Sequence, residues 1–248
     1  MTERKLTWQK GMVLLAAMLG VAITSSLGLW QLGRAAEKID LQADRDAQSA
    51  KETLDGRSIH AGVQNEPLKS QLMHRRMVIK GRWLEAYTVY LENRQMRGKP
   101  GFFVLTPLQI EGTGEVLVVQ RGWAQRSFVD RSALPAIETP AGPVEVQGHL
   151  APWPSRLYDF GGEELGPIRQ NLDLQTYRQE TKLANLLNLS LLQSGPASQG
   201  LLRDWPVVAS GVEKHHGYAF QWFGLSGLIA LLYVWFQIVK PRRSNRKA

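Results

Sequence analysis

Two long runs without a charged residue constrain this chain more than any other feature of its sequence. They extend from Gly11 to Gly33 and from Gly217 to Val239, and each contains 23 residues. As an α-helix, a run of this length spans about 35 Å, whereas the hydrocarbon core of a bilayer is about 30 Å thick. We therefore predict two transmembrane helices, at residues 11–33 and 215–239.

The first run also has features of a signal peptide, with a basic start and an apolar centre. However, Thr24, Ser25 and Ser26 would form a poor cleavage site. The apolar stretch also continues to Leu32, which is too long for a usual signal core. A retained membrane anchor is the favoured interpretation.

The excess positive charge is concentrated in two short tails. The chain carries a net charge of +8, of which residues 1–10 contribute +2 and residues 240–248 contribute +5. A nucleic-acid-binding protein carries its basic patch on the folded domain, so the nearly neutral middle argues against nucleic acid as a partner. Basic flanks mark the cytoplasmic side of a membrane span. We expect both tails in the cytoplasm and the central domain in the periplasm, with the chain held by the lipids of the cell inner membrane.

The segment between the two runs changes from a helical to a strand pattern. Residues 34–56 keep a helical spacing of apolar positions and should extend the first helix to a cap at Gly56. In residues 57–214, the stretches 101–110 and 116–123 flank a turn at Glu111–Gly114 and predict a hairpin. Asp173 can cap a helix of about fifteen residues. Further strands are expected near residues 77–83, 88–91, 144–150, 189–192 and 201–208. The expected fold is a mainly antiparallel β domain, barrel- or sandwich-like, with one or two helices.

Known catalytic signatures are missing from the sequence. The chain has no cysteine, which excludes disulfides and thiolate metal sites. It also lacks a nucleophile elbow, a zinc-protease motif and a phosphate-binding loop. We therefore expect a protein that is not an enzyme.

The entry to the second apolar run is the most distinctive polar segment. On a helix, His215, Tyr218 and Trp222 share one face, and Gln221 lies nearby. An aromatic belt at the lipid headgroups would also explain this composition. If the two spans are antiparallel, this segment meets the end of the first span at Arg34. Imidazole, aromatic rings and a guanidinium together suit an amphiphilic porphyrin with a histidine iron ligand. His215 and His216 lie about 100° apart on a helix, so they cannot be opposite ligands of one iron.

Five segments carry a resemblance to a known family. They are Gly28–Arg34, Arg76–Arg82, Gly101–Pro107, Val118–Trp123 and His215–Phe223. In this order between two spans, they resemble the surfeit locus protein 1 family of cytochrome c oxidase assembly factors. The family usually has an asparagine before Arg-Gly-Trp, where this chain has Gln120, and the role of that side chain is left open.

The resemblance implies a function and a site. Bacterial members of this family look like haem a-binding chaperones in respiratory chain biogenesis, with oxidase subunit I and other assembly factors as partners. The family's histidine falls on His215, which becomes the expected iron ligand, and the candidate pocket residues are Arg34, Tyr218, Gln221 and Trp222. Arg121–Gly122–Trp123 is expected to be structural, because a glycine beside a bulky aromatic suggests a bend or a close backbone approach. The alternatives are a scaffold that holds an oxidase intermediate without a cofactor, and an enzyme or sensor with an unrecognised site.

Overall fold

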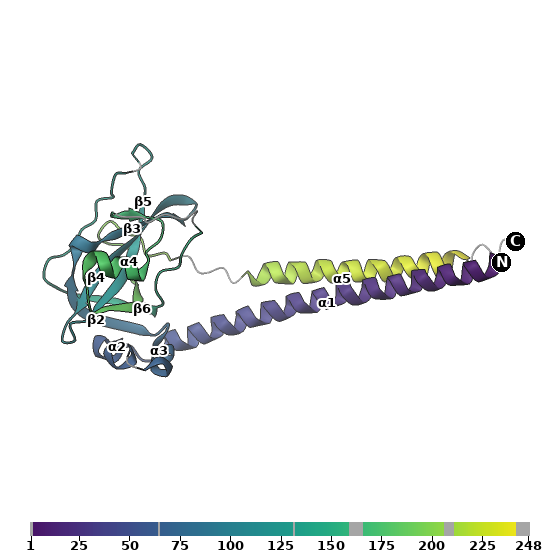
Figure 1. The fold of residues 1–248 in the computed structure, drawn as a ribbon, viewed down its shortest axis with the longest axis horizontal. Coiled ribbons are helices and arrows are strands. Elements are labelled where there is room, and N and C mark those ends of the chain that lie inside the picture. Colours follow the sequence, from purple (N-terminus) through teal and green to yellow (C-terminus); the bar gives the residue numbers. More distant parts are fainter. Residues whose placement is uncertain (1, 64, 131, 159–165, 206–210, 242–248) are drawn as a thin grey trace. The chain divides into compact units, whose positions relative to one another are not determined.

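The computed structural model describes residues 2–63, 65–130, 132–158, 166–205 and 211–241. The chain divides into two compact units. The helix unit comprises residues 1–43 and 207–248, and the β domain comprises residues 44–206. Figure 1 shows the elements of both units along the chain.

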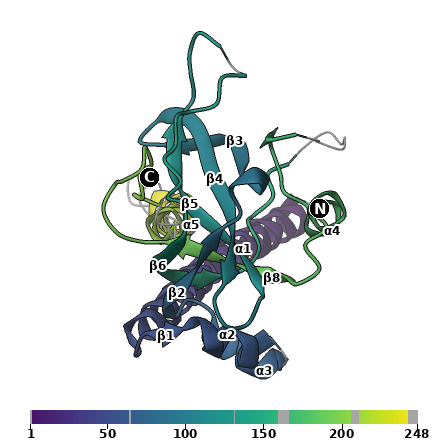
Figure 2. The ribbon, with the colours of Figure 1, turned by 90° about the vertical axis from the view of Figure 1, so that its left-hand side faces the viewer.

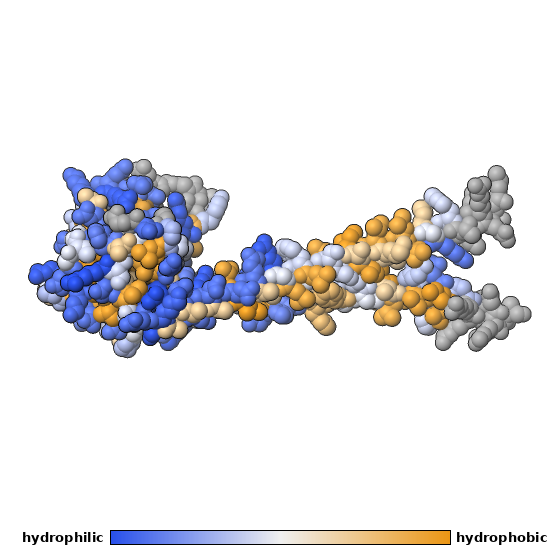
Figure 3. Space-filling model, turned by 90° about the horizontal axis from the view of Figure 1, so that it is seen from below, coloured by the Kyte–Doolittle hydropathy of each residue, from blue (hydrophilic) through white to orange (hydrophobic). Residues whose placement is uncertain are grey.

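The helix unit contains α1 (Thr2–Ala50) up to residue 43 and α5 (Val212–Val234), and η2 (Trp235–Val239) continues α5 as a π-helical turn. Both helices are long and apolar enough to cross a membrane. Most of their apolar side chains are exposed, and Figure 3 shows these hydrophobic residues along the helix pair. The core helix of a soluble protein would bury them, so the two helices indicate a membrane protein.

α1 ends earlier than its sequence pattern predicts. It stops at Ala50, and Gly56 is the first residue of α2 (Gly56–Val63) instead of a C-terminal cap. Leu54 and Asp55 form the short strand β1, which pairs with the following strand β2 (Arg76–Trp83). This pairing takes the backbone out of the helix.

Five strands of the described chain close into a barrel. Strand β2 pairs with β6, β6 with β8, β8 with β5 and β5 with β4, and β4 returns to pair with β2. All these pairs are antiparallel except β5–β8. Figure 2 shows the strands wrapped around a common interior. The barrel form of the predicted fold is thus confirmed. The bounds are β2 (Arg76–Trp83), β4 (Lys99–Ile110), β5 (Val116–Gln125), β6 (Pro143–Ala151) and β8 (Leu186–Gln193).

The predicted hairpin is confirmed as β4 and β5. Its turn at Glu111–Gly114 is closed by the amide of Ile110, which donates to the carbonyl of Glu115 over 2.8 Å. Gly112 and Gly114 have φ of 85° and 69°, a region that favours glycine. The hairpin extends beyond the barrel to β3 (Val89–Met96), which pairs with β4 and with β7 (Ile168–Arg169).

The described part of the β domain has three apolar clusters, and two of them form most of its core. The larger fills the barrel and includes Ile59 of α2 and Leu72 of α3 (Glu66–Leu72). These two short helices, which the sequence did not locate, lie together near β2 (Figure 1). The second cluster packs Tyr177 of α4 (Leu174–Thr181) against β3, β4 and β5.

Asp173 caps α4 as predicted, and its carboxylate accepts from the Thr176 amide over 2.9 Å. The helix has eight residues and not about fifteen, because Lys182 adopts a left-handed conformation with φ of 55°. Between β2 and β3, η1 (Glu85–Tyr87) forms a single 3-10 turn. The strand predicted near 201–208 is reduced to isolated bridges at Leu201 and Leu202, and residues 206–208 lie outside the described residues.

Candidate functional site

α1 and α5 pack against each other as an antiparallel pair. The hydroxyl groups of Ser25 and Ser226 lie 2.9 Å apart. One turn further along α1, a Cβ added to Gly28 would lie 2.8 Å from the ring of Phe223. Higher residue numbers on one helix therefore meet lower numbers on the other, and small residues allow the backbones to approach closely.

The packed positions recur at alternating intervals of three and four residues. This spacing is that of a coiled-coil seam, in which successive side chains face the partner helix. We call these positions the seam. On α1 the seam includes Ala17, Val21, Thr24, Gly28, Gln31 and Ala35, and on α5 it includes Val212, His215, Ala219, Trp222, Ser226 and Ile229. The seam therefore brings the predicted ligand His215 to face α1.

His215 meets Gln31 at this seam. Nδ1 of the imidazole lies 2.7 Å from Oε1 of the Gln31 amide, and both residues are half-buried. An amide oxygen only accepts hydrogen bonds, so Nδ1 carries the proton that is donated. Nε2 has no hydrogen-bond partner among the residues that the structure describes. The lone pair of a neutral imidazole is thus available at Nε2.

The other predicted site residues lie beside this contact. Trp222 is half-buried in the seam, one heptad after His215, whereas Gln221 is exposed. Tyr218 is 51% exposed at the edge of the α5 face. Arg34 lies on the flank of α1, where its guanidinium pairs with Glu37 over 2.8 Å and stacks 5.8 Å from the Trp30 ring centre.

Gln31 was not among the individual residues predicted for the site, although it lies within the predicted segment Gly28–Arg34. The seam spacing is the signal that identifies it. Gln31 follows Gly28 and Thr24 at intervals of three and four, so it belongs to the face that packs on α5.

The donor set fits a planar group held by one imidazole. Within the described ranges, no three histidine or acidic side chains gather into a metal-binding cluster. A bare metal ion would need such a cluster, whereas haem iron can be held by a single axial histidine. Large apolar side chains near the contact are exposed, and these include Trp30 at 55% and Phe220 at 79%. They offer apolar surface to a macrocycle at the end of a membrane span.

Arg121–Gly122–Trp123 has the structural role that the sequence predicts. Arg121 is the extra residue of a β-bulge in β5, opposite Val104 and Leu105. A Cβ on Gly122 would lie 2.7 Å from the carbonyl oxygen of Leu202. The Trp123 amide donates to this same oxygen over 2.7 Å, so the expected close backbone approach is confirmed.

The side chain of Gln120 forms a hydrogen bond within the β domain. Its side-chain amide donates to the hydroxyl of Ser190 over 2.9 Å, and this hydroxyl donates to the carbonyl of Pro152 over 2.6 Å. The two bonds connect β5 to β8 and to the end of β6 at the parallel pair of the barrel. Gln120 therefore has a structural contact within the β domain.

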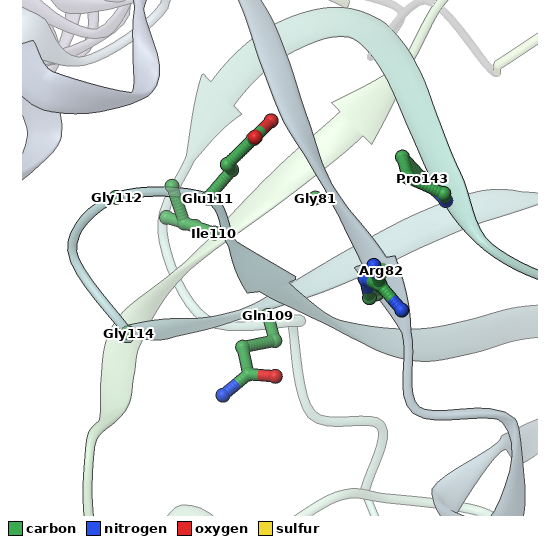
Figure 4. A pocket seen from close by; sticks show the side chains of 8 residues that line it. All are labelled: Gly81, Arg82, Gln109, Ile110, Glu111, Gly112, Gly114 and Pro143. Atoms are coloured by element: carbon green, nitrogen blue, oxygen red, sulfur yellow. The ribbon is translucent and has the colours of Figure 1, made fainter.

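A cavity of about 360 Å³ lies beside the β4–β5 turn. Arg82 and Glu111 supply its charged groups, and these side chains do not point toward one another (Figure 4). Their separation leaves the cavity without a convergent binding group. It is lined by Gly81, Arg82, Gln109, Ile110, Glu111, Gly112, Gly114 and Pro143.

Comparison with known proteins gives a consistent result. The family model described as SURF1 family matches residues 18–227 of the chain. A SURF1-like protein of Rickettsia prowazekii is 25% identical over 220 residues, which cover 86% of this chain and 84% of that protein. A SURF1-like protein of Rickettsia bellii is 27% identical over 240 residues, which cover 94% of this chain and 92% of that protein. The matched region includes most of α1 and α5 and the whole β domain.

Proposed function

Because the chain belongs to the SURF1 family, we propose that it holds haem a at the seam between α1 and α5 during assembly of cytochrome c oxidase. Family membership supports a role in oxidase assembly in general. The haem-binding step, its site and its partner, oxidase subunit I, are parts of the proposal.

The contact between His215 and Gln31 is the observation that carries this proposal. It orients the imidazole so that the neutral form has its Nε2 lone pair available, and exposed aromatic side chains lie on the same candidate membrane spans. Neutral imidazole is a common axial ligand of haem iron. The alternative explanation is an aromatic belt at the lipid headgroups. Such a belt would not require an amide that accepts a hydrogen bond from the histidine ring.

The surrounding side chains have distinct roles in this proposal. When bound, haem a supplies an iron that accepts a nitrogen ligand and a macrocycle with anionic propionates. His215 donates its Nε2 lone pair to the iron, while Tyr218 and Trp222 cover the apolar surface of the macrocycle. Arg34 lies within one turn of Gln31, and its second guanidinium edge can pair with a carboxylate while the first remains with Glu37. A single protein ligand to the iron suits a carrier that must release its haem a.

The proposed location is the cell inner membrane, with both tails in the cytoplasm and the β domain in the periplasm. Net charges of +2 and +5 on the two tails support this orientation. The seam contact of His215 then lies near the periplasmic surface, where assembly partners of subunit I can reach it.

An absorption spectrum of the purified protein tests the proposal. The full chain is produced in cells that make haem a, and the Soret band is compared among wild type, His215→Ala and His216→Ala. His216 is the matched control, because it is exposed on another face of the same helix turn. We expect His215→Ala to reduce the band at least tenfold and His216→Ala to retain most of it.

Equal bands in the two variants would contradict this site. If the His215→Ala strain also assembled oxidase with its normal haem content, the family role would be explained better by a scaffold that holds no cofactor.

A further inference from the structure

We propose that Gln31 is a positioning residue that selects Nε2 of His215 as the ligating nitrogen. The inference rests on the proposed function, because it concerns the same histidine. It adds a residue from the other helix, on which the orientation and tautomer of the ligand depend.

The first step is the chemistry of the contact. Gln31 Oε1 lies 2.7 Å from Nδ1, a distance typical of a good hydrogen bond. The oxygen accepts and cannot donate, so the bond exists only when Nδ1 is protonated. A neutral imidazole has one proton, and Nε2 is therefore left with its lone pair. A hydrogen bond to one ring nitrogen commonly fixes the ligating role of the other.

The packing of α1 against α5 holds this contact in place. Gln31 and His215 lie in the same seam as the Ser25–Ser226 hydrogen bond and the Gly28–Phe223 contact. These contacts fix the register of the two helices along the next turns into the apolar segment. The Gln31 amide is thus held opposite the imidazole by the packing of the whole pair.

The acceptor of the His215 hydrogen bond is the neutral side-chain amide of Gln31. Histidine ligands that donate to a carboxylate become more basic and bind their metal more strongly. An amide fixes the same tautomer with a smaller gain in basicity. Gln31 therefore orients the ligand while keeping the iron–nitrogen bond weak enough for transfer.

The tautomer can be measured without haem. The full chain is labelled with ¹⁵N at histidine, studied in detergent micelles about two pH units above the ordinary imidazole pKa of 6.5, and its ring nitrogen shifts are recorded by NMR. The chain has five histidines, and the His215→Ala spectrum identifies the signals of His215. We expect the Nδ1–H tautomer in wild type and a shift toward Nε2–H in Gln31→Leu. Gln31→Glu restores an acceptor and should retain Nδ1–H.

The same variants are then titrated with haem a. Loss of a partner behind a metal-binding histidine typically weakens binding by about 10–100-fold, so Gln31→Leu should show a loss of this size. Gln31→Glu should bind at least as tightly as wild type and release haem more slowly. Gln237→Leu, the same substitution in the π-helical turn at the other end of α5, is the matched control and should match wild type in both measurements.

Each result has a defined meaning. If wild type shows Nε2–H, or if Gln31→Leu leaves the tautomer unchanged, the positioning role of Gln31 is wrong, even if His215 binds haem. If the tautomer responds to Gln31 but wild type binds no haem a, the proposed function is wrong. The assignment of His215 as an iron ligand is then wrong as well.

Discussion

The guanidinium of Arg121 is fully buried, and its hydrogen-bond acceptors in the described part of the chain are all neutral groups. They are the hydroxyl of Thr139 at 2.8 Å, the carbonyl of Glu138 at 2.7 Å and the side-chain oxygen of Gln199 at 2.8 Å. Burial lowers the pKa of Arg121 to about 10, which still leaves the group charged at neutral pH. The Trp83 ring, 4.8 Å away, adds a cation–π contact. Arg121 thus connects β5 to the 138–139 and 199 segments.

Arg121→Ala should destabilise the β domain by about 3–5 kcal/mol, because it leaves buried acceptors without their donor and creates a cavity. Thermal or denaturant unfolding of the detergent-solubilised chain measures this loss. Arg82→Ala is the matched control: Arg82 is an exposed arginine of the same barrel, and its removal should change stability by less than about 0.5 kcal/mol. Equal effects of the two substitutions would show that the buried network contributes little.

At the scale of elements, the seam of α1 and α5 depends on residues with little or no side chain. Gly28 is buried against the Phe223 ring, whereas Gly33, five residues further along the same helix, has no atom within 4 Å of an added Cβ. The two glycines therefore provide a comparison of the same substitution inside and outside the seam. The hydroxyl pair of Ser25 and Ser226 provides a position at which the helix register can be read.

Gly28→Leu should separate the helices, at a cost of about 1–3 kcal/mol for overpacking. A Ser25→Cys/Ser226→Cys variant should form an interhelical disulfide under mild oxidation. We expect Gly28→Leu to suppress this cross-link and to weaken haem a binding, and Gly33→Leu to leave both unchanged. A cross-link that persists with Gly28→Leu would indicate that the seam does not set the register.

At the scale of the whole molecule, the sequence predicted the two helices, the hairpin and the barrel class because each depends on local patterns. Charge-free runs and alternating strand residues are visible within short windows. The closure of β2 onto β4 and the parallel pairing of β5 with β8 depend on distant segments and left no local signal. For the candidate site, the family resemblance predicted His215. The seam partner Gln31 lies 184 residues away and required the register of the two helices.

The orientation of the molecule can be tested with single cysteines, because the natural chain has none to interfere. We expect Glu111→Cys, at the β4–β5 turn, to react with an impermeant maleimide in intact spheroplasts. Thr2→Cys and Ser244→Cys should react only after the membrane is permeabilised. Labelling of either tail in intact spheroplasts would contradict the proposed orientation, and it would move the seam contact of His215 away from the periplasmic surface.

The repeating spacing of the seam also means that the two helices can slip only in whole steps. The smallest slip that again places seam positions against the partner's seam is half a heptad, three or four residues, which displaces one helix by about 5 Å relative to the other. His215 would then face Gly28 or Ala35, and neither carries a side-chain amide. The proposed ligand geometry consequently depends on a single register: the observed pairing of the helices forms the contact between His215 and Gln31, and a slipped pairing loses it.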